Sequence, residues 1–390
     1  MKILINAVSA KSGGAATYIR NLACSIPTLD QHNQYVLYVP SQYQESLAHI
    51  SARVKVVGTD IGSKPAWRRF LWDQIILRRI AWKEKADILL SSSDFGILFP
   101  SCHQIIMVRN PLFFSSLYLD TILPTKSYRY NLEFTFRRWL IARSVMASDL
   151  VMTASKSMLD DVRRFIPIPE GRAMINAFGV PLARFDCRWK MGERERPCQN
   201  GSCQLLYVTE YSDYKNLTTL LKAMLLLRER GEKEISLLCT ADPSNFPHVE
   251  ISSRELDHSL AMHPMIVSCV RFTGPLPYED IPKLYGDSDV FVFPSLAESF
   301  GHPLVEAMAS GLPVIASDIP VCREICGDAA VYFSPLDTKD LAEKVVLLCR
   351  DSSLRKRLGQ IGRERAETLF NWDDHVRRLV EAVSRVASTT

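Results

Sequence analysis

The 390-residue sequence contains no run of 18 or more apolar residues, so it predicts no membrane-spanning helix. Its first ten residues, MKILINAVSA, carry one lysine and a short apolar run that Asn6 interrupts, which is too little for a signal peptide. The G-x-G-x-x-G fingerprint of dinucleotide-binding domains is also missing, and its absence argues against a dehydrogenase. We therefore expect a cytoplasmic chain.

Paired cysteine motifs are absent as well. The ten cysteines are scattered, several of them inside apolar runs such as LLC and VSCV, where we expect buried thiols. A disulfide framework is not expected in a long cytoplasmic chain. The pairs Cys198/Cys203 and Cys322/Cys326 lack the C-x2-C spacing of a zinc site, so no metal bound through cysteine is predicted.

The composition, with 47% hydrophobic and 23% charged residues, is that of a soluble globular protein, and 390 residues suit two domains. Short apolar runs alternate with longer helical patterns from KILINAV to RAMINAF, and the alternation restarts at CQLLYVT. Such alternation predicts parallel strands with crossover helices. The expected fold is therefore α/β, with two doubly wound Rossmann-like domains that face an inter-domain cleft.

A charged stretch without periodicity separates the two halves and predicts a linker at 187–203. We place the N-terminal domain at 1–186 and the C-terminal domain at 204–370. Amphipathic patterns predict the last helices from Thr338 and from Trp372.

The stretch Phe291–Ser317 places two carboxylates, Glu298 and Glu306, on either side of a glycine turn. A buried strand ending at Pro294, a turn at Gly301 and a short following helix are predicted. Backbone N–H groups at a helix start favour anions, so the turn suits a diphosphate. Carboxylates would repel a bound phosphate, so we expect them to accept hydrogen bonds from hydroxyl groups attached to it. A sugar nucleotide has such hydroxyl groups on both sides of its diphosphate. The alternative is a solvated helix face.

The run ESFGHPLVE at 298–306, with its E-x7-E spacing, and the following GLPVIAS resemble the donor site of retaining glycosyltransferase family 4, which has the GT-B fold. The runs SGGAATYIRNL, NAFGVPLARF, YVTEYSDYKNLTTLLKAM and FTGPLPYEDIPKLYGDSDVFVFPS occur in the family's order. The resemblance covers nearly the whole chain, strongly in the C-terminal half and more loosely from about Asp30 to Asp149. It implies a final helix at 371–390 that crosses back to the N-terminal domain.

This resemblance implies a retaining, metal-independent hexosyltransferase of cell-surface polysaccharide biosynthesis. It would move a sugar from a nucleoside-diphosphate donor to a glycan, lipid-linked at the cytoplasmic membrane face. The donor is a substrate, so no cofactor is implied, and no nucleic-acid partner is expected. The implied catalytic residues are Glu298, Lys215 and Arg109. The implied donor-binding residues are Gly13, Gly14, Thr273, Gly274, Ser299, Phe300, Gly301, His302, Pro303, Leu304 and Glu306.

By the same resemblance, Glu298 contacts the donor sugar, Glu306 holds the ribose hydroxyls, and Lys215 neutralises the diphosphate. The sequence departs from the family at one point, because Thr209-Glu210 stands where the family usually has Gly-Arg. Another basic residue would have to replace that arginine. Asp287 and Asp289 form a D-x-D pattern, but their place before the strand VFVFPS favours turn and capping roles over a metal site.

Each candidate residue in the N-terminal half has a purely structural interpretation as well as a functional one. Gly13 and Gly14 allow close approach of a phosphate or acceptor, or simply make a flexible turn. Arg109 follows the strand IIMV, where many relatives have a histidine, and it is either an anion-binding group or an ordinary loop arginine.

Two segments, 64–85 and 128–143, mix Lys and Arg with aromatic residues. They suit peripheral binding to an anionic membrane, or they are helices that cover a sheet with their basic residues toward water. Two further functions stay open. A sugar-nucleotide epimerase shares the fold but needs acid/base carboxylates and a histidine aimed at the sugar, and Glu210 leaves room for an inactive donor-binding subunit.

Overall fold

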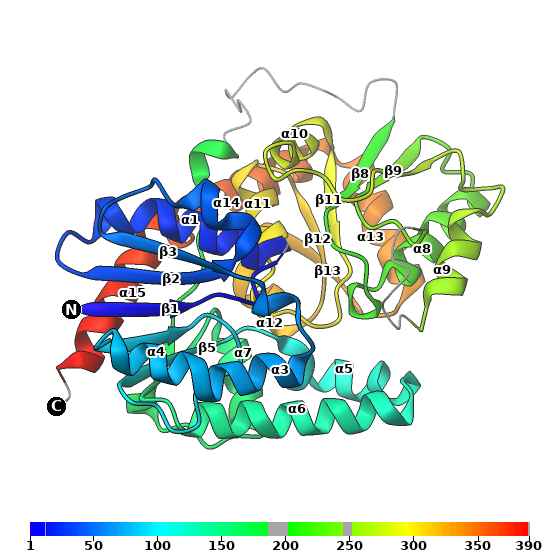
Figure 1. The fold of residues 1–390 in the computed structure, drawn as a ribbon. Helices are drawn as coiled ribbons and strands as arrows, with labels where there is room; N and C mark the ends of the chain where they lie inside the picture. The colour runs from blue at the N-terminus through cyan, green and yellow to red at the C-terminus, as the bar shows by residue number, and fades with distance from the viewer. Residues whose placement is uncertain (12, 186–201, 245–251, 389–390) are drawn as a thin grey trace. The chain divides into compact units, whose positions relative to one another are not determined.

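The computed structural model describes residues 1–11, 13–185, 202–244 and 252–388, and it divides into two compact units (Figure 1). Unit 1 consists of Met1–Phe114, Tyr128–Phe178 and Trp372–Thr390. Unit 2 consists of Ser115–Ser127 and Gly179–Asn371. Each unit contains one parallel sheet, so the expected pair of Rossmann-like domains is confirmed.

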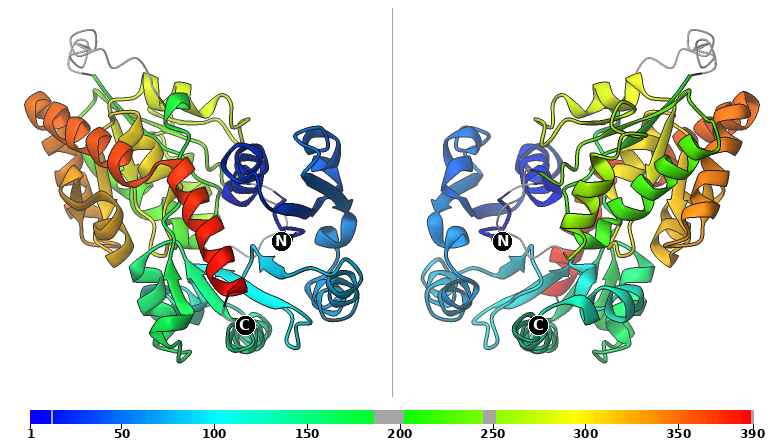
Figure 2. Two further views of the ribbon diagram at one scale, coloured as in Figure 1. Left: turned by 90° about the vertical axis from the view of Figure 1, so that its left-hand side faces the viewer. Right: turned by 90° about the vertical axis from the view of Figure 1, so that its right-hand side faces the viewer.

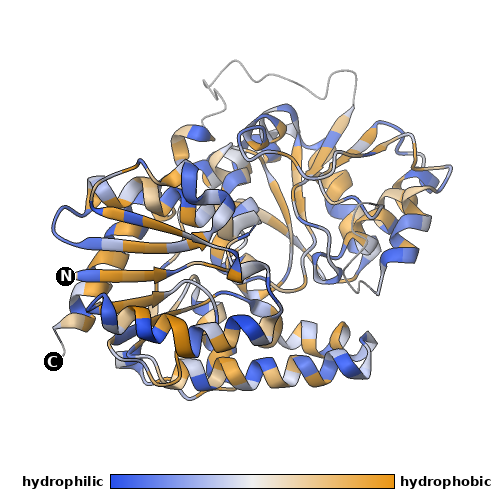
Figure 3. Cartoon of the chain, viewed as in Figure 1, coloured by the Kyte–Doolittle hydropathy of each residue, from blue (hydrophilic) through white to orange (hydrophobic). Residues whose placement is uncertain are grey.

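The sheet of unit 1 has seven parallel strands in the order β3-β2-β1-β4-β5-β6-β7. Figure 3 shows these strands as mainly hydrophobic, as expected for strands with helices on both faces. The strands are β1 (Lys2–Asn6), β2 (Gln34–Pro40), β3 (Val54–Thr59), β4 (Ile88–Ser91), β5 (His103–Val108), β6 (Leu150–Thr153) and β7 (Ala173–Ile175). The edge strand β3 was not foreseen, because its buried first residue is followed by partly exposed positions that give no continuous apolar run.

The helices of unit 1 are α1 (Gly13–Leu29), α2 (Gln44–Leu47), α3 (Ala66–Trp72), α4 (Arg78–Lys83), α6 (Tyr128–Met146), α7 (Lys156–Arg163) and α15 (Trp372–Ala387). A π-helical turn, η3 (Asp73–Leu77), joins α3 to α4. The 3-10 turns are η1 (Ser41–Tyr43), η2 (Asp60–Ser63), η4 (Pro111–Phe113) and η6 (Glu170–Arg172).

Helix α15 belongs to unit 1 although it ends the sequence, and it packs against α1 (Figure 2). Its Trp372 indole nitrogen donates to the Ser25 hydroxyl at 2.9 Å. His375 is fully buried, and its Nε2 lies 3.1 Å from the Tyr18 hydroxyl. These contacts hold the amphipathic face of α15 on the N-terminal sheet unit.

The sheet of unit 2 has six parallel strands in the order β10-β9-β8-β11-β12-β13. They are β8 (Cys203–Tyr207), β9 (Ile235–Cys239), β10 (Val270–Phe272), β11 (Val290–Phe293), β12 (Val314–Ser317) and β13 (Ala330–Phe333). The helices are α5 (Ser116–Thr121), α8 (Leu217–Glu229), α9 (Arg254–Ala261), α10 (Ile281–Asp287), α11 (His302–Ala309), α12 (Pro320–Cys326), α13 (Thr338–Arg350) and α14 (Ser352–Leu369). The 3-10 turns are η5 (Leu123–Thr125), η7 (Leu182–Arg184), η9 (Asp213–Lys215) and η10 (Gly327–Ala329).

The division into units differs from the expected N-terminal domain at 1–186 in two segments. Residues 115–127 join unit 2, where Lys126 forms a buried ion pair with Asp213. Residues 179–185 also join unit 2, since the Val180 N–H donates to the Phe370 carbonyl at 3.0 Å and Phe185 is fully buried. The predicted linker, 187–203, lies outside the described residues except for its last two positions.

One cysteine expectation is wrong. Cys203 at the start of β8 and Cys349 in α13 form a disulfide with a Cα–Cα distance of 5.8 Å. The strand and helix bring together two residues 146 positions apart, which no spacing pattern in the sequence indicates.

Among the described residues, no helix combines the length and apolar character that crossing a bilayer requires.

Candidate active site

The order of strands in unit 2 reverses between β8 and β11, and the loops after these two strands are joined to each other. Asn216, in the left-handed conformation at φ 57°, donates from its side chain to the Pro294 carbonyl at 3.1 Å. The Leu296 N–H donates to the Tyr214 carbonyl at 2.8 Å. Ligands of open α/β sheets bind at such a switch point, beyond the carboxyl ends of the strands.

The two joined loops bring Lys215 and Glu298 into an ion pair. Lys215 comes from η9 after β8, and Glu298 from the loop between β11 and α11. The side chains are 13% and 10% exposed, and the ammonium donates directly to the Glu298 carboxylate. Sequence reasoning named both residues for one site, and the structure places them in contact across 83 positions.

The surroundings of Lys215 are aromatic and electronegative. Its Nζ lies 4.8 Å from the Tyr214 ring centroid and 5.8 Å from that of Phe293, and its carbonyl accepts a hydrogen bond from the Tyr207 hydroxyl at 2.5 Å. Burial lowers the pKa of Lys215, but the Glu298 carboxylate outweighs this and the net pKa is raised. The ammonium is therefore charged at neutral pH.

The glycine turn before α11 is formed as expected. Gly301 has φ 81°, and a Cβ there would lie 3.0 Å from Leu304 Cδ1, so a larger residue would be strained. The Leu304 N–H donates to the Gly301 carbonyl at 2.9 Å, while Pro303 has no N–H. Ser299 and His302 are partly exposed in this turn, whereas Phe300 is buried against Phe370 at a ring distance of 5.5 Å.

Glu306 lies in α11 and is buried, with 6% of its surface exposed. Its Oε2 accepts a hydrogen bond from the Tyr285 hydroxyl at 2.9 Å, and the Tyr278 side chain also lies near the carboxyl group. Burial raises the pKa of Glu306 to about 7, although both tyrosines lower it. The two glutamates of the E-x7-E motif therefore have different environments, one paired with a cation and one buried and hydrogen-bonded to a phenol.

The remaining candidates of unit 2 lie after β10. The Thr273 N–H donates to the Cys239 carbonyl at 2.9 Å, and Gly274 adopts φ 69° in a buried turn. They start the loop that carries Tyr278, which sequence reasoning did not single out although it lies in the family-like run before β11. Sequence reasoning also missed Tyr285 and Asn216. Their roles depend on which side chains and loops the fold brings together, and the sequence does not show this.

Glu210 is exposed and adds negative charge near Lys215, whose pKa it helps to raise. The adjacent Thr209 is fixed by its N–H, which donates to the Thr240 hydroxyl at 2.8 Å. Asp289, from the D-x-D pattern, accepts the N–H of Gln204 in β8 at 2.8 Å, which is a structural role other than the turn and capping roles expected for it.

The candidates from the N-terminal half lie in unit 1. Gly13 and Gly14 are exposed at the start of α1, Gly13 with φ 57°. The Arg109 guanidinium is enclosed by the rings of Tyr18 and Phe178, at 4.5 and 4.7 Å from their centroids. Burial lowers the pKa of Arg109, while Tyr18 and Asp94 raise it.

A polar group at the switch point of the first sheet was missed by sequence reasoning. The Asn6 side chain, at the end of β1, donates to Asp73 Oδ1 at 2.9 Å. Asp73 lies in the π turn η3, and burial raises its pKa to about 7 despite the Asn6 hydrogen bond and the charge of Arg69. The next residue, Gln74, binds the backbone of Gly96 and Leu98. A π turn inside a helical pattern leaves no signature in apolar periodicity.

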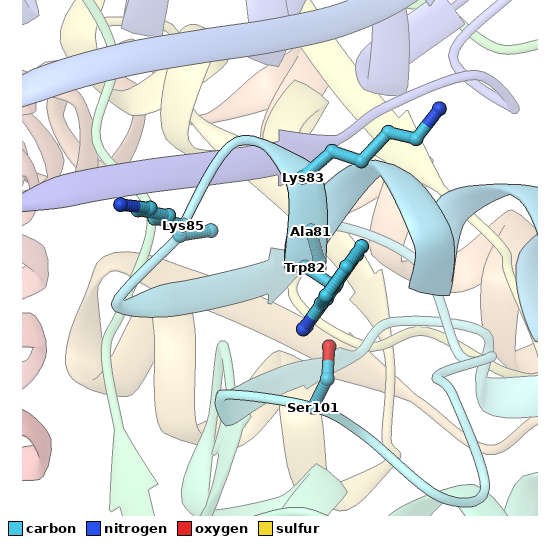
Figure 4. Close-up of a pocket in the computed structure, with 6 residues that line it drawn as sticks. Ala81, Trp82, Lys83, Lys85 and Ser101 are labelled. Atoms are coloured by element: carbon cyan, nitrogen blue, oxygen red, sulfur yellow. The ribbon is translucent and has the colours of Figure 1, made fainter.

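A pocket of about 440 Å³ opens in unit 1 at the end of α4, near the amino end of β4. The Trp82 indole nitrogen and the Ser101 hydroxyl point toward one another, whereas Lys83 and Lys85 extend away (Figure 4). None of the residues predicted for the donor site lines this pocket.

The comparisons with known proteins agree with this geometry. Residues 194–365 match the family model described as glycosyl transferases group 1. The chain is 25% identical over 249 residues to the O-antigen chain mannosyltransferase B of Escherichia coli, and this match spans 61% of each protein. Sucrose-phosphate synthase from Thermosynechococcus elongatus superposes over the whole of both chains, with a TM-score of 0.80 and 18% identity.

Anabaena Alr3699/HepE, solved in complex with UDP-glucose, covers 99% of this chain and 100% of its own, with a TM-score of 0.71 and 17% identity. The segment 194–365 thus resembles the glycosyl transferases group 1 family, and the arrangement of both sheets is that of the GT-B fold.

Proposed function

We propose that this protein is a retaining glycosyltransferase that moves a sugar from a nucleoside diphosphate to a glycan hydroxyl in polysaccharide biosynthesis. The observation that carries the proposal is the Lys215–Glu298 ion pair at the switch point of unit 2. The pair supplies one cation for the departing diphosphate and one carboxylate for the sugar, side by side. The mannosyltransferase relative and the UDP-glucose complex of Alr3699/HepE support the same class of reaction and donor.

In this proposal, Lys215 neutralises the negative charge that develops on the diphosphate as the bond to the anomeric carbon breaks. Glu298 accepts hydrogen bonds from the sugar hydroxyls and stabilises the positive charge at that carbon. The backbone of the glycine turn at Phe300–His302 binds diphosphate oxygens, and Glu306 accepts hydrogen bonds from the ribose. We assign Thr273 and Gly274 to contacts with the base.

The missing arginine leaves Lys215 as the cation that the joined loops place at the proposed diphosphate site. Because Glu210 adds a negative charge there, the positive charge of Lys215 faces the two negative charges of Glu298 and Glu210 in the free protein. We propose that the α11 N-terminus supplies the remaining stabilisation and that no divalent metal takes part.

We further propose that the acceptor is lipid-linked and that unit 1 binds the anionic cytoplasmic face of the membrane. Two helical segments of unit 1 expose large apolar side chains: Trp67, Leu71, Ile75, Ile76 and Trp82 on α3–α4, and Tyr128, Leu132, Phe136, Trp139 and Met146 on α6. Gln74 of η3 and Ser144 of α6 both donate to the Gly96 carbonyl, so the segments are neighbours. We call these ten residues the aromatic face, and exposed arginines lie among them.

Donor turnover tests the proposed activity. The protein is incubated with UDP-, GDP-, ADP- and dTDP-sugars, first selected by thermal stabilisation, because a bound donor raises apparent stability by mass action. Release of nucleoside diphosphate with a sugar added to a glycan acceptor supports the proposal. Appearance of an epimer instead would establish an epimerase, and binding without turnover would establish an inactive subunit.

A further inference from the structure

Residues 115–127 form a segment of the N-terminal half of the sequence that belongs to unit 2. Their neighbours along the chain, Phe114 and Tyr128, belong to unit 1. Within unit 2 the segment folds as α5 and η5, and Tyr118 of α5 is buried. The chain therefore leaves unit 1 for this segment alone before it returns to α6, and the contacts of the segment in unit 2 include the loop that carries Lys215.

Lys126, near the end of this segment, forms an ion pair with Asp213 at the start of η9. The side chains are 3% and 7% exposed, and the ammonium donates to Asp213 Oδ2. Beside this pair, the Thr125 hydroxyl donates to the Ser252 hydroxyl at 3.1 Å. Because a buried charge needs a partner of opposite sign, the pair fixes the segment to η9.

The second carboxylate oxygen of Asp213 is bound as well. Its Oδ1 accepts the Ser253 N–H at 3.0 Å and the Ser253 hydroxyl at 3.2 Å. The Ser253 hydroxyl also lies 2.8 Å from Asp257 Oδ2, which accepts the Tyr211 hydroxyl at 2.7 Å. Asp213 is thus held between two segments, and Lys126 supplies positive charge to this network of acidic and hydroxyl groups.

Asp213 and Lys215 are the two ends of one 3-10 turn. The Asn216 N–H donates to the Asp213 carbonyl at 2.9 Å, so a shift of Asp213 moves the backbone that carries Lys215. A displacement of about 1 Å can cost on the order of 10²-fold in rate. The position of the Lys215 ammonium therefore depends on what holds Asp213.

We propose that Lys126 is a positioning residue for the donor diphosphate, since it holds η9 through Asp213 and so keeps Lys215 where the terminal phosphate binds. This role rests on the proposed function of Lys215. Lys126 acts through Asp213 and not on the donor, because its own ammonium is buried and paired. Removal of its charge should therefore weaken the contact with the terminal phosphate and spare the contacts with the nucleoside.

Isothermal titration of the full-length protein with UDP and with UMP tests this, with the guanine and adenine nucleotides titrated in parallel. Lys126→Met keeps the length of the side chain but removes its charge. We expect it to weaken UDP binding about tenfold and UMP binding less than about twofold, because a charge-assisted hydrogen bond from Lys215 is lost. A merely structural role would weaken the binding of both nucleotides alike.

Asp213→Asn distinguishes positioning from direct contact. It leaves Lys126 without its charged partner, so a lysine that bound the diphosphate itself would hold UDP as tightly as before or more tightly. Positioning predicts instead a loss of about tenfold, and no further loss in the double variant Lys126→Met/Asp213→Asn, since the two residues act as one unit. The double variant removes both buried charges, and it replaces Lys126→Met if that variant does not fold.

Lys344→Met is the matched control, because its ammonium pairs with Asp340 within α13. It is expected to leave the affinities for UDP and UMP unchanged.

Folded Lys126 variants that keep the wild-type affinity for UDP, or that lose UDP and UMP equally, would overturn the inference. Tighter UDP binding by Asp213→Asn would overturn it too, and would make Lys126 a direct ligand of the diphosphate. If Lys215→Met abolishes the preference for UDP over UMP while the Lys126 variants keep it, the role of Lys215 stands and that of Lys126 is wrong. If the wild-type protein binds none of the diphosphates, the proposed function itself fails.

Discussion

The two sheets of this protein share one strand order, yet the edges at which their strands end have different chemistry. In unit 2 the loops after β8 and β11 are tied together and present an ion pair, Lys215–Glu298, with both side chains partly exposed. In unit 1 the corresponding switch point lies between β1 and β4, and its carboxyl group, Asp73, is buried beside Asn6, which raises its pKa to about 7. The same topology thus supports an ion pair beyond the strand ends of unit 2 and a buried carboxyl group beyond the strand ends of unit 1.

The difference also appears on the outer helices. Unit 1 exposes the aromatic face, with Trp82 71% exposed and Tyr128 79% exposed, while the helices of unit 2 expose few aromatic residues. A fold therefore fixes where a ligand can bind, and the side chains at the strand ends decide what it can be.

The largest effect is expected at Glu298. Glu298→Gln keeps the size of the side chain but removes the charge opposite Lys215, and turnover should fall on the order of 10²-fold or more because the lost contact strengthens as charge develops. Steady-state assays of donor and acceptor consumption measure this, with circular dichroism to confirm folding. Glu343→Gln, on the exposed side of α13, is the matched control. Near-normal turnover would remove Glu298 from the mechanism.

The next effect concerns the aromatic face of unit 1. If it binds anionic lipid, replacing the exposed residues Arg68, Arg78, Arg79 and Lys83 with glutamine should weaken vesicle binding at least about tenfold, since each basic residue near the surface contributes roughly 1 kcal/mol. Sedimentation with phosphatidylglycerol vesicles measures it, and salt should release the wild type.

The control for this experiment makes the same charge change in unit 2, at Lys222, Lys233, Lys356 and Arg357, all of them exposed. That variant should still sediment with the vesicles. If the wild type stays in the supernatant even at low salt, α3, α4 and α6 are ordinary sheet-covering helices and the acceptor is soluble.

Glu306→Ala is expected to weaken donor affinity by about tenfold, with a smaller change in turnover, because ribose contacts exist in the ground state and the transition state alike. Titration with the donor nucleotide measures it, and Glu229→Ala on α8 is the control. An unchanged donor affinity in a folded variant would contradict the ribose assignment and leave only Glu298 at the site.

The two buried carboxyl groups, one in each unit, should give the protein an unusual pH dependence. Burial raises the pKa of Asp73 from 3.8 and that of Glu306 from 4.5 to about 7 each. At pH values between the ordinary and the raised pKa, the folded chain binds more protons than the unfolded chain. The free energy of unfolding therefore falls as pH rises, and each group contributes up to about 1.4 kcal/mol per pH unit.

Urea unfolding between pH 4.5 and 7.5 measures this slope. Asp73→Asn should flatten it for unit 1, and Glu306→Gln should flatten it for unit 2. If neither substitution changes the slope, the two carboxyl groups have ordinary pKa values in the folded protein.

The smallest expected effect is that of a chelator. Because Lys215 and the start of α11 are proposed to stabilise the diphosphate, activity should survive EDTA with no measurable loss. Activity that disappears in EDTA and returns with Mg²⁺ or Mn²⁺ would mean that the lost arginine is replaced by a metal ion.

Much of this architecture could be predicted because apolar runs and their alternation depend on local sequence. The strands VFVF and CQLLY and the glycine turn at Gly301 formed as expected. The edge strand β3, the π turn at Asp73 and the Cys203–Cys349 disulfide were not foreseen. Each depends on neighbours far along the chain, which periodicity does not register.

The sequence by itself determined the class of fold and the position of the glycine turn, because strand patterns and turn residues act over a few positions. The roles of Lys215, Glu298 and Glu306 stay predictions from the family resemblance. Only the tertiary structure decided that Lys215 pairs with Glu298, that the Tyr285 hydroxyl donates to the buried Glu306, and that Arg109 lies between two rings. Charge state and hydrogen bonding depend on burial and on partners brought from distant segments, and these are set when the sheets assemble.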